Sequence, residues 1–288
     1  MKNIFTILSL LCVIFCTSAF AQDDMMSMLD AETPKQKEYA KNAFKSSRVI
    51  NCHSMEMIAK KSLDFRILHR FGNIKPGIYD LFGLDQASMR MGFDYGLTKN
   101  LTIGIGRSTL NKEIDGFVKY RVLWQGVNGG SPVSIVLIAG TTLKTIRFAD
   151  PTRKNYFTSR LGYYYQVIVG RKFNENFSLQ LTPTLVHRNI IEKKDDSNDI
   201  YAVSVGGRYK VTKRLAVLAD YSQIMNGYPA KFNQNPLSLG VDIETGGHVF
   251  QLHVSNTRGL NERAFITETT NDFFKGNMFF GFNLSRMF

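Results

Sequence analysis

From Leu63 to the carboxyl end, apolar or aromatic residues alternate with glycine, hydroxyl or charged residues. The alternation is clearest over 87–96, 161–170 and 201–210. Successive side chains of a β-strand point to opposite faces, so this period of two predicts strands with one apolar and one polar face. A chain built from many such segments forms a barrel or a sandwich, and the periodicity of single strands does not distinguish the two.

The lengths of the connections do distinguish them. About twelve strands are predicted, near residues 63–71, 86–96, 101–109, 114–124, 133–143, 158–172, 177–187, 200–210, 215–224, 238–245, 248–256 and 276–288. Alternate connections are tight, and most of the others are long, the exception being the short connection at 110–113. Bacterial outer-membrane barrels have short periplasmic turns and long extracellular loops. The chain is therefore expected to be all-β, an antiparallel up-and-down transmembrane β-barrel over residues 62–288.

The amino-terminal residues predict export. Lys2 precedes an almost unbroken apolar run over 4–15, and Ala19-Phe20-Ala21 has the small-x-small form that a signal peptidase accepts. The run is too short to span a bilayer as a helix, so a signal peptide over 1–21, cleaved after Ala21, is predicted. A lipid-modified Cys16 is the less favoured alternative, because Phe15 stands where such a site needs a small residue. Export places the barrel in the outer membrane.

Residues 22–61 are polar and lack the alternation. We interpret them as a periplasmic arm or as a plug segment, and these two alternatives stay open. The acidic start at Asp30 to Pro34 favours a short helix that continues over 38–45.

The last predicted strand carries apolar residues on one face and ends in an aromatic residue. These residues are Phe280, Phe282, Leu284 and Phe288. The pattern resembles the terminal signal by which outer-membrane barrels are handed to their assembly machinery, although Arg286 departs from it. That machinery, during biogenesis, and the outer-membrane lipids are the expected partners.

The chain is basic, and its charges gather on the polar face of the strands. The net charge of +12 becomes +11 without Lys2, from 35 basic and 24 acidic residues. Nucleic acid is not an expected partner of an exported protein. Eight basic and four acidic residues share the phase expected to face the lumen: Asp64, Arg66, Arg70, Arg90, Asp94, Asp115, Lys119, Arg121, Arg160, Arg208, Lys210 and Asp220. A basic lumen favours anions.

Two functions follow from this face. The first is a narrow pore or carrier for a small anionic or amphiphilic solute. The second is a closed structural barrel, with an interior of paired charges, whose extracellular loops bind lipopolysaccharide or a partner protein. One loop carries four cations suited to lipid phosphates: Lys144, Arg147, Arg153 and Lys154.

Enzymatic and metal chemistry receive little support. The five histidines lack metal-ligand spacing, and Cys52 is the one cysteine after the predicted signal peptide. His253 and Ser255 share a strand face, where two residues lie roughly 7 Å apart, too far for a hydroxyl–imidazole hydrogen bond. We expect no cofactor and no metal, and a membrane-embedded lipid-modifying enzyme is the third and least favoured function.

Several stretches together resemble one family. They are Phe44 to Asn51, His53-Ser54, Leu63 to Arg66, His69 to Gly72, Tyr79 to Ala87, Tyr95 to Thr98, Ile103 to Ser108 and Asp115 to Tyr120. The chain resembles DUF5777, a Bacteroidetes family of β-barrels, over most of the predicted mature chain, with Cys52 in place of an expected glycine. The resemblance implies a barrel fold and an outer-membrane location, and it implies no particular activity.

Overall fold

The computed structural model of the chain describes residues 38–148, 152, 154–191, 196–226, 234–246 and 248–288. Within these, Tyr39–Phe288 form one compact unit. The predicted signal peptide and residues 22–37 lie outside the described residues.

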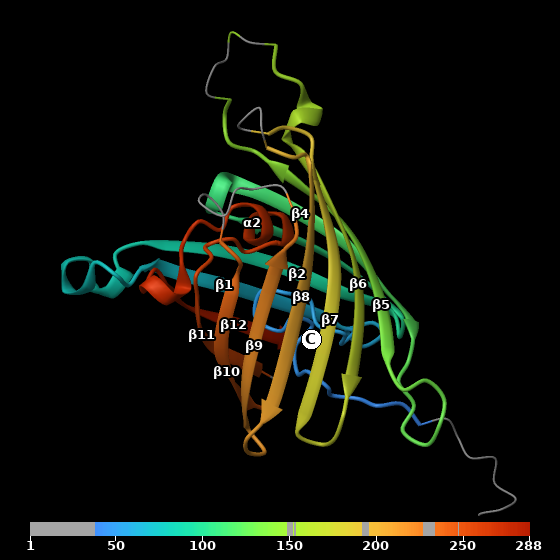
Figure 1. The fold of residues 1–288 in the computed structure, drawn as a ribbon. Helices are drawn as coiled ribbons and strands as arrows, with labels where there is room; N and C mark the ends of the chain where they lie inside the picture. Colours follow the sequence, from blue (N-terminus) through green and yellow to red (C-terminus); the bar gives the residue numbers. More distant parts are fainter. Residues whose placement is uncertain (1–37, 149–151, 153, 192–195, 227–233, 247) are drawn as a thin grey trace, which may run out of the picture. The chain divides into compact units, whose positions relative to one another are not determined.

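Twelve antiparallel strands pair in sequence order, and the last strand pairs with the first to close a barrel (Figure 1). The strands are β1 (Leu63–Asn73), β2 (Ala87–Thr98), β3 (Leu101–Ser108), β4 (Glu113–Leu123), β5 (Ser134–Lys144), β6 (Leu161–Lys172), β7 (Phe177–Arg188), β8 (Asp199–Lys210), β9 (Leu215–Ile224), β10 (Leu237–Thr245), β11 (His248–Ser255) and β12 (Phe279–Met287). The predicted up-and-down barrel is confirmed. Strands β6 and β12 begin later in the chain than predicted, at Leu161 and Phe279.

The connections fall into two sets at opposite ends of the barrel. The tight ones join β2 to β3, β4 to β5, β6 to β7, β8 to β9 and β10 to β11 (Figure 1). The other end carries η1 (Gly77–Gly83), η2 (Leu110–Lys112), η3 (Phe157–Arg160), α2 (Glu262–Thr267) and η4 (Phe273–Lys275). We call these the short-turn end and the long-loop end. In the described part of the chain, no helix combines the length and apolar character needed to cross a membrane.

The alternation along each strand matches the two faces of the barrel wall. In β6, Tyr163, Tyr165 and Val167 point outward and are partly or largely exposed, whereas Tyr164 and Gln166 are buried. The outward face therefore carries apolar and aromatic side chains all round the wall, which is the surface that acyl chains contact in a membrane barrel.

The interior is divided between charge and apolar side chains. Strands β1, β2 and β4 bury charged groups such as Arg66, Arg90 and Lys119. The inward side chains of β5 to β9 mix polar and apolar groups, and the buried apolar ones include Val136, Ile138, Tyr164, Ile168, Val186, Ile200 and Leu218. A water-filled lumen would solvate such apolar groups, so their complete burial means that protein fills this half of the barrel.

Residues 43–58, which we call the inner loop, fill it. Figure 1 shows this part of the chain (blue) passing among the strands. Tyr39 forms a bridge with Gly126 before the loop, and the Lys61 amide donates to the Gly96 carbonyl after it, so the loop enters and leaves at the short-turn end. Its apolar side chains belong to the same buried cluster as those of β5 to β9.

The helix expected over 38–45 is wrong for these described residues. The amides of Ala43 and Phe44 donate to the Glu56 carboxylate, at 2.6 and 3.3 Å, so the two limbs of the inner loop are tied to each other. These side-chain hydrogen bonds satisfy donors that a helix would otherwise use, and local polar pairing of this kind competes with helix formation.

Candidate functional site

The tip of the inner loop is a tight turn anchored on one carboxylate. The Val49 amide donates to the Cys52 carbonyl at 2.8 Å, which reverses the chain. The amides of Ile50, Asn51 and Cys52 lie 3.2, 2.7 and 3.2 Å from Oδ2 of Asp220 on β9. Successive backbone N–H groups that converge on an anion form a nest, and here the anion belongs to the barrel wall.

Other wall side chains bind the rest of the loop backbone. Buried N–H and C=O groups must find partners, and a loop without a neighbouring strand takes them from side chains. The wall residues that hydrogen-bond to backbone atoms of the inner loop are Thr102, Lys119, Arg121, Gln180, Asp220, Gln251 and Asn283. Much of the polar inward face thus serves to hold a segment of the same chain.

A second segment closes the barrel from the long-loop end. We call residues 256–268, which include α2, the cap. Asn261 begins the helix, because its side chain accepts from the Ala264 amide at 2.8 Å, and all six residues of α2 are buried. Arg263 binds both carboxylate oxygens of Glu113, at 2.5 and 2.7 Å, and one oxygen of Glu268 at 2.7 Å.

These ion pairs fix the ionisation of the cap. Burial alone raises the pKa of Glu268, but the cations of Arg263 and Lys144 outweigh burial and hold this pKa at about 2. Burial opposes the charge of Arg263 too, and its carboxylate partners nevertheless raise its pKa above the ordinary value. Glu268 and Arg263 therefore keep their charges over the whole physiological pH range.

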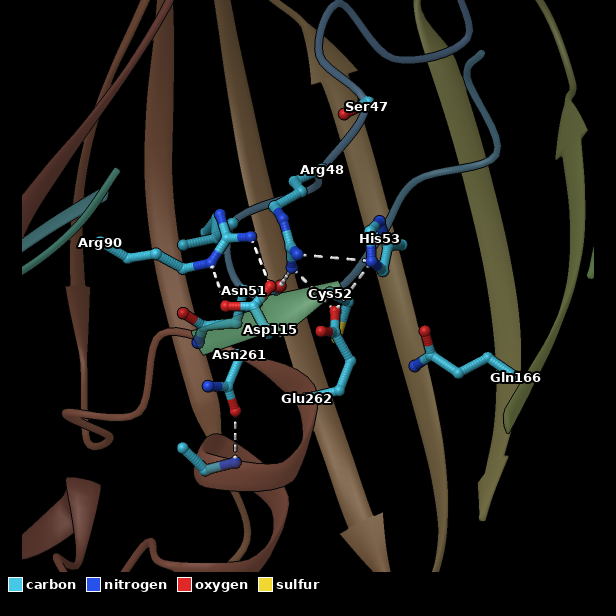
Figure 2. Close-up of polar contacts among 12 residues, drawn as sticks. Ser47, Arg48, Asn51, Cys52, His53, Arg90, Asp115, Gln166, Asn261 and Glu262 are labelled. Atoms are coloured by element: carbon cyan, nitrogen blue, oxygen red, sulfur yellow. Dashed lines mark hydrogen bonds and ion pairs between the residues drawn. The ribbon is translucent and has the colours of Figure 1, made fainter. Parts of the chain in front are cut away.

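The inner loop and the cap meet inside the barrel (Figure 2). Arg48 Nη1 lies 2.8 Å from Glu262 Oε1, and both side chains are almost completely buried. His53 Nε2 lies 3.3 Å from Glu262 Oε1 and 3.3 Å from Arg48 Nη2, so a neutral imidazole can donate to the first or accept from the second. We call Arg48, His53 and Glu262 the junction.

Burial lowers the pKa of His53 well below its ordinary value, and the Arg48 cation lowers it further. Burial also opposes the charge of Arg48, but the Glu262 carboxylate outweighs it and raises the Arg48 pKa. The junction is thus one ion pair with a neutral histidine beside it. The His53 ring also packs edge-on against Phe117, with the ring centroids 4.5 Å apart.

Paired charges of the wall surround the junction. Arg90 donates to both oxygens of Asp115, at 2.8 and 2.5 Å, in the bidentate geometry that makes such pairs strong (Figure 2). Arg66 pairs with Asp64 on the same strand. Charges that are buried in pairs form a solid interior, in contrast to the hydrated lining of an open pore.

Ten of the twelve residues expected to face the lumen are buried in the barrel interior: Asp64, Arg66, Arg70, Arg90, Asp94, Asp115, Lys119, Arg121, Arg208 and Asp220. Lys210, at the end of β8, is only half-buried. The prediction for Arg160 is wrong, because 157–160 form the η3 turn and not the start of a strand. Its guanidinium lies 3.9 Å from the centroid of the Phe148 ring and donates to the Lys144 carbonyl.

Sequence reasoning missed charged residues of the barrel interior, both acidic and basic. Glu113, Arg188 and Asp242 are buried strand residues in the inward phase, and the alternation of β4 and β10 carried the signal for two of them. Among described strand residues the buried charges are then seven basic and six acidic. The basic excess expected for the lumen is absent from this set. Arg48, Glu262 and Arg263 lie outside any strand period, so no periodic signal marked them.

The loop expected to bind lipid phosphates is only partly available. Lys144 lies at the end of β5 and pairs with Glu268 at 2.8 Å. Arg147 and Lys154 are exposed, and Arg153 lies outside the described residues. Lipid binding by this loop stays a prediction. Two of its four cations, Arg147 and Lys154, are exposed in the part of the loop that the structure describes.

The predicted assembly residues lie at the outer surface. Phe280, Phe282 and Leu284 share the outward face of β12, and Phe288 is exposed after it. The Phe282 ring stacks on His69 of β1, with ring centroids 4.7 Å apart, at the seam where the barrel closes. Their role in assembly stays a prediction.

His253 and Ser255 do not bond to each other, and Cys52 is a buried thiol. Ser255 contacts the hydroxyl of Ser238 at 2.8 Å, and both ring nitrogens of buried His253 lack a partner among the described residues. Burial raises the pKa of Cys52 well above the ordinary value, so its thiol stays protonated, 3.9 Å from the Ser222 hydroxyl. No group of three metal-ligating side chains converges within the described part of the chain.

Two solved structures that are similar to the chain are a porin and an outer membrane channel. The chain is similar to the solved structure of a KdgM porin at 9% identity and a TM-score of 0.48, covering 79% of this chain and 99% of that one. It is also similar to the COG4313 outer membrane channel from Pseudomonas putida F1, at 12% identity and 0.47, covering 81% and 97%. Among curated proteins, none matches the sequence.

The family comparison covers the barrel and the inner loop together. Residues 44–288 match the family described as membrane bound beta barrel domain (DUF5777). The match begins at Phe44, within the inner loop, so the buried segment is part of the domain. The chain belongs to the DUF5777 family of membrane-bound β-barrels.

Proposed function

We propose that this protein is an outer-membrane β-barrel channel that its own inner loop holds closed, and that a small solute passes only when this loop moves. The outer-membrane location is supported by the sorted lengths of the connections, with the short-turn end toward the periplasm. The closed state is supported by the burial of residues 47–55 within the barrel.

One observation carries the gating role. Both limbs of the inner loop reach the short-turn end, at the Tyr39–Gly126 bridge and at the contact between Lys61 and Gly96. The tip is held to the wall and the cap by side-chain hydrogen bonds, ion pairs and apolar packing, and not by pairing with a wall strand. The loop can therefore leave the lumen through the end by which it enters, without breaking any pairing between strands.

The interior does not select the charge of the solute. Seven basic and six acidic buried strand residues leave almost no excess of either sign. The preference for an anionic or amphiphilic solute must then come from a mouth of the barrel, because the first site that a solute meets can still carry a net charge.

A disulfide between the loop and the wall tests the gate. Cys52 Sγ lies 3.9 Å from the Ser222 hydroxyl, so Ser222→Cys should form a disulfide with Cys52 when the barrel refolds under oxidising conditions. In planar bilayers we expect conductance steps from the reduced variant and none from the oxidised one. The matched control is Ser222→Cys with Cys52→Ser, which should conduct in either redox state.

The second candidate is a permanently closed structural barrel. The seven wall side chains that bind the loop backbone favour it, since a segment held in this way is stable in place. This alternative predicts no steps from any variant. Steps that persist in the oxidised Ser222→Cys protein would instead show that the inner loop is not the gate.

A further inference from the structure

A cavity of about 460 Å³ lies at the short-turn end, between the inner loop and the wall. Both limbs of the loop line it, through Phe44 and Met57 among others, and the turns of the wall contribute Lys99 and Trp124. A volume of this size is in the range of sites that hold small molecules, roughly 300–1,000 Å³. A solute that approaches the closed barrel from the periplasmic side would meet this cavity first.

The cavity is positively charged. Five basic residues line it, and they are Lys41, Lys45, Lys60, Lys99 and Arg121. The two acidic residues, Glu56 and Asp64, are already engaged: Glu56 accepts the amides of the loop, and Asp64 pairs with Arg66. Lys45 pairs with Glu244 at 3.0 Å, but neither Lys60 nor Lys99 has an ion-pair partner among the described residues.

One cation of the cavity is fixed at its inner side. Arg121 is 3% exposed, stacks on Trp124 at 3.9 Å from the ring centroid, and donates to the Met55 carbonyl. Its Nε has no partner among the described residues, and the Glu56 carboxylate is 4.0 Å away. A buried guanidinium with an unused donor is suited to a carboxylate.

The lining also has an apolar part, beside the polar side chains of Asn42, Ser46, Ser47 and Ser285. Phe44, Met57, Ile58 and Trp124 face the same cavity as the lysines. A small, highly hydrated anion gains nothing from such surface, whereas an apolar tail is stabilised by leaving water. The combination of cations and apolar side chains therefore points to a ligand with both characters.

We infer that this cavity binds a small amphiphilic anion, a carboxylate with a short apolar tail. The carboxylate lies among Lys60, Lys99 and Arg121, and the tail packs on Phe44 and Trp124. Binding at this site does not require the gate, but its role as the entry site of the transported solute rests on the proposed function.

Trp124 is the one tryptophan of the chain, so tryptophan fluorescence reports on the cavity that it lines. We would titrate the protein in lipid nanodiscs with sodium hexanoate and follow Trp124 fluorescence and the heat of binding. Hexanoate should give a saturable signal that weakens with added salt, and acetate and 1-hexanol should each bind far more weakly. Lys60→Gln with Lys99→Gln should weaken hexanoate about fivefold or more, as expected for two exposed charges.

The matched control is Lys213→Gln, which removes a lysine from another turn at the same end, outside the cavity, and should leave binding unchanged. Equal binding of 1-hexanol, equal weakening by Lys213→Gln, or the absence of a saturable signal in both measurements would overturn the inference. The oxidised Ser222→Cys protein separates the two proposals, because it should still bind hexanoate while it no longer conducts.

Discussion

Asp220 is the residue on which the position of the inner loop most depends. Its Oδ2 accepts three consecutive amides, and charged hydrogen bonds of this kind are worth about 1.5–3 kcal/mol each. Asp220→Asn keeps the shape and removes the charge, so we expect the free energy of unfolding to fall by about 1.5–3 kcal/mol. Urea titration in lipid vesicles measures this loss. Glu175→Gln, at an exposed turn, is a control for the exchange of an acid for its amide. An Asp220→Asn barrel as stable as the wild type would contradict the assignment.

His53 links the closed state to pH. Burial holds its pKa well below the ordinary value of 6.5, so the folded protein binds the proton less readily than the unfolded chain does. The stability contributed by neutral His53 is thus present above about pH 6.5 and is lost as the pH falls toward the lowered pKa. We expect His53→Gln to reduce the decline of thermal stability between pH 7 and pH 5. An identical decline in both proteins would show that other groups cause it.

For single residues, the sequence predicts the buried position correctly where the residue belongs to a strand in which apolar and polar side chains alternate. Asp115 and Lys119 were expected in the interior and are buried there. Glu262 forms the junction with Arg48, yet both residues lie in segments without a period. Nothing in the order of residues along the chain marks a pair separated by more than 200 positions, because their contact depends on where two loops meet inside a closed sheet.

Among the elements, the contact between the inner loop and α2 is carried by the Arg48–Glu262 ion pair. Glu262→Gln leaves a buried guanidinium without its counter-ion, and such a loss costs about 3–5 kcal/mol. Replacing both partners by methionine removes the uncompensated charge, so the double variant should recover part of that loss. Unfolding titrations of Arg48→Met, Glu262→Met and the double variant measure the coupling. Losses that simply add would mean that the two side chains do not interact.

The strands have a separate test at their lipid face. Val167 of β6 points outward, and arginine near the middle of the bilayer costs about 2–4 kcal/mol in membrane barrels. We expect this loss for Val167→Arg and almost none for Val167→Leu, measured by urea titration in vesicles. A spin label at Tyr165 should be reached by oxygen dissolved in the lipid and shielded from a water-soluble relaxant. Shielding from both reagents would show a packed protein core at this face.

The elements also show why the plug was only one of two alternatives. Residues 43–58 have no alternation, and their polar composition suits an arm in water as well as a loop in a polar interior. The barrel supplies the decisive partners, since the loop backbone is satisfied by side chains such as Gln180 and Gln251 on distant strands. A segment whose backbone is held in large part by side chains of distant strands cannot be placed from its own residues alone.

For the whole molecule, the barrel followed from features that act along the entire chain. Alternation set the number of strands, and the sorted connections set their antiparallel order, as the closed sheet confirms. The state of the lumen did not follow. Charge counts suggested a basic passage, but Arg160 lies in the η3 turn, and Glu113 and Asp242 are buried in the interior. A few misassigned residues were enough to turn a near-balance of buried charges into an expected basic excess.

Hydrogen–deuterium exchange of the protein in lipid nanodiscs tests most directly whether the inner loop closes the barrel. Peptides that cover residues 43–58 should exchange as slowly as the strands, because the loop amides are buried and bonded to wall side chains such as Asp220. The exposed turn at 212–214 should exchange quickly and serves as the internal reference. Exchange of 43–58 at the rate of that turn, with the strands still protected, would show that the loop lies outside the lumen and would contradict the account.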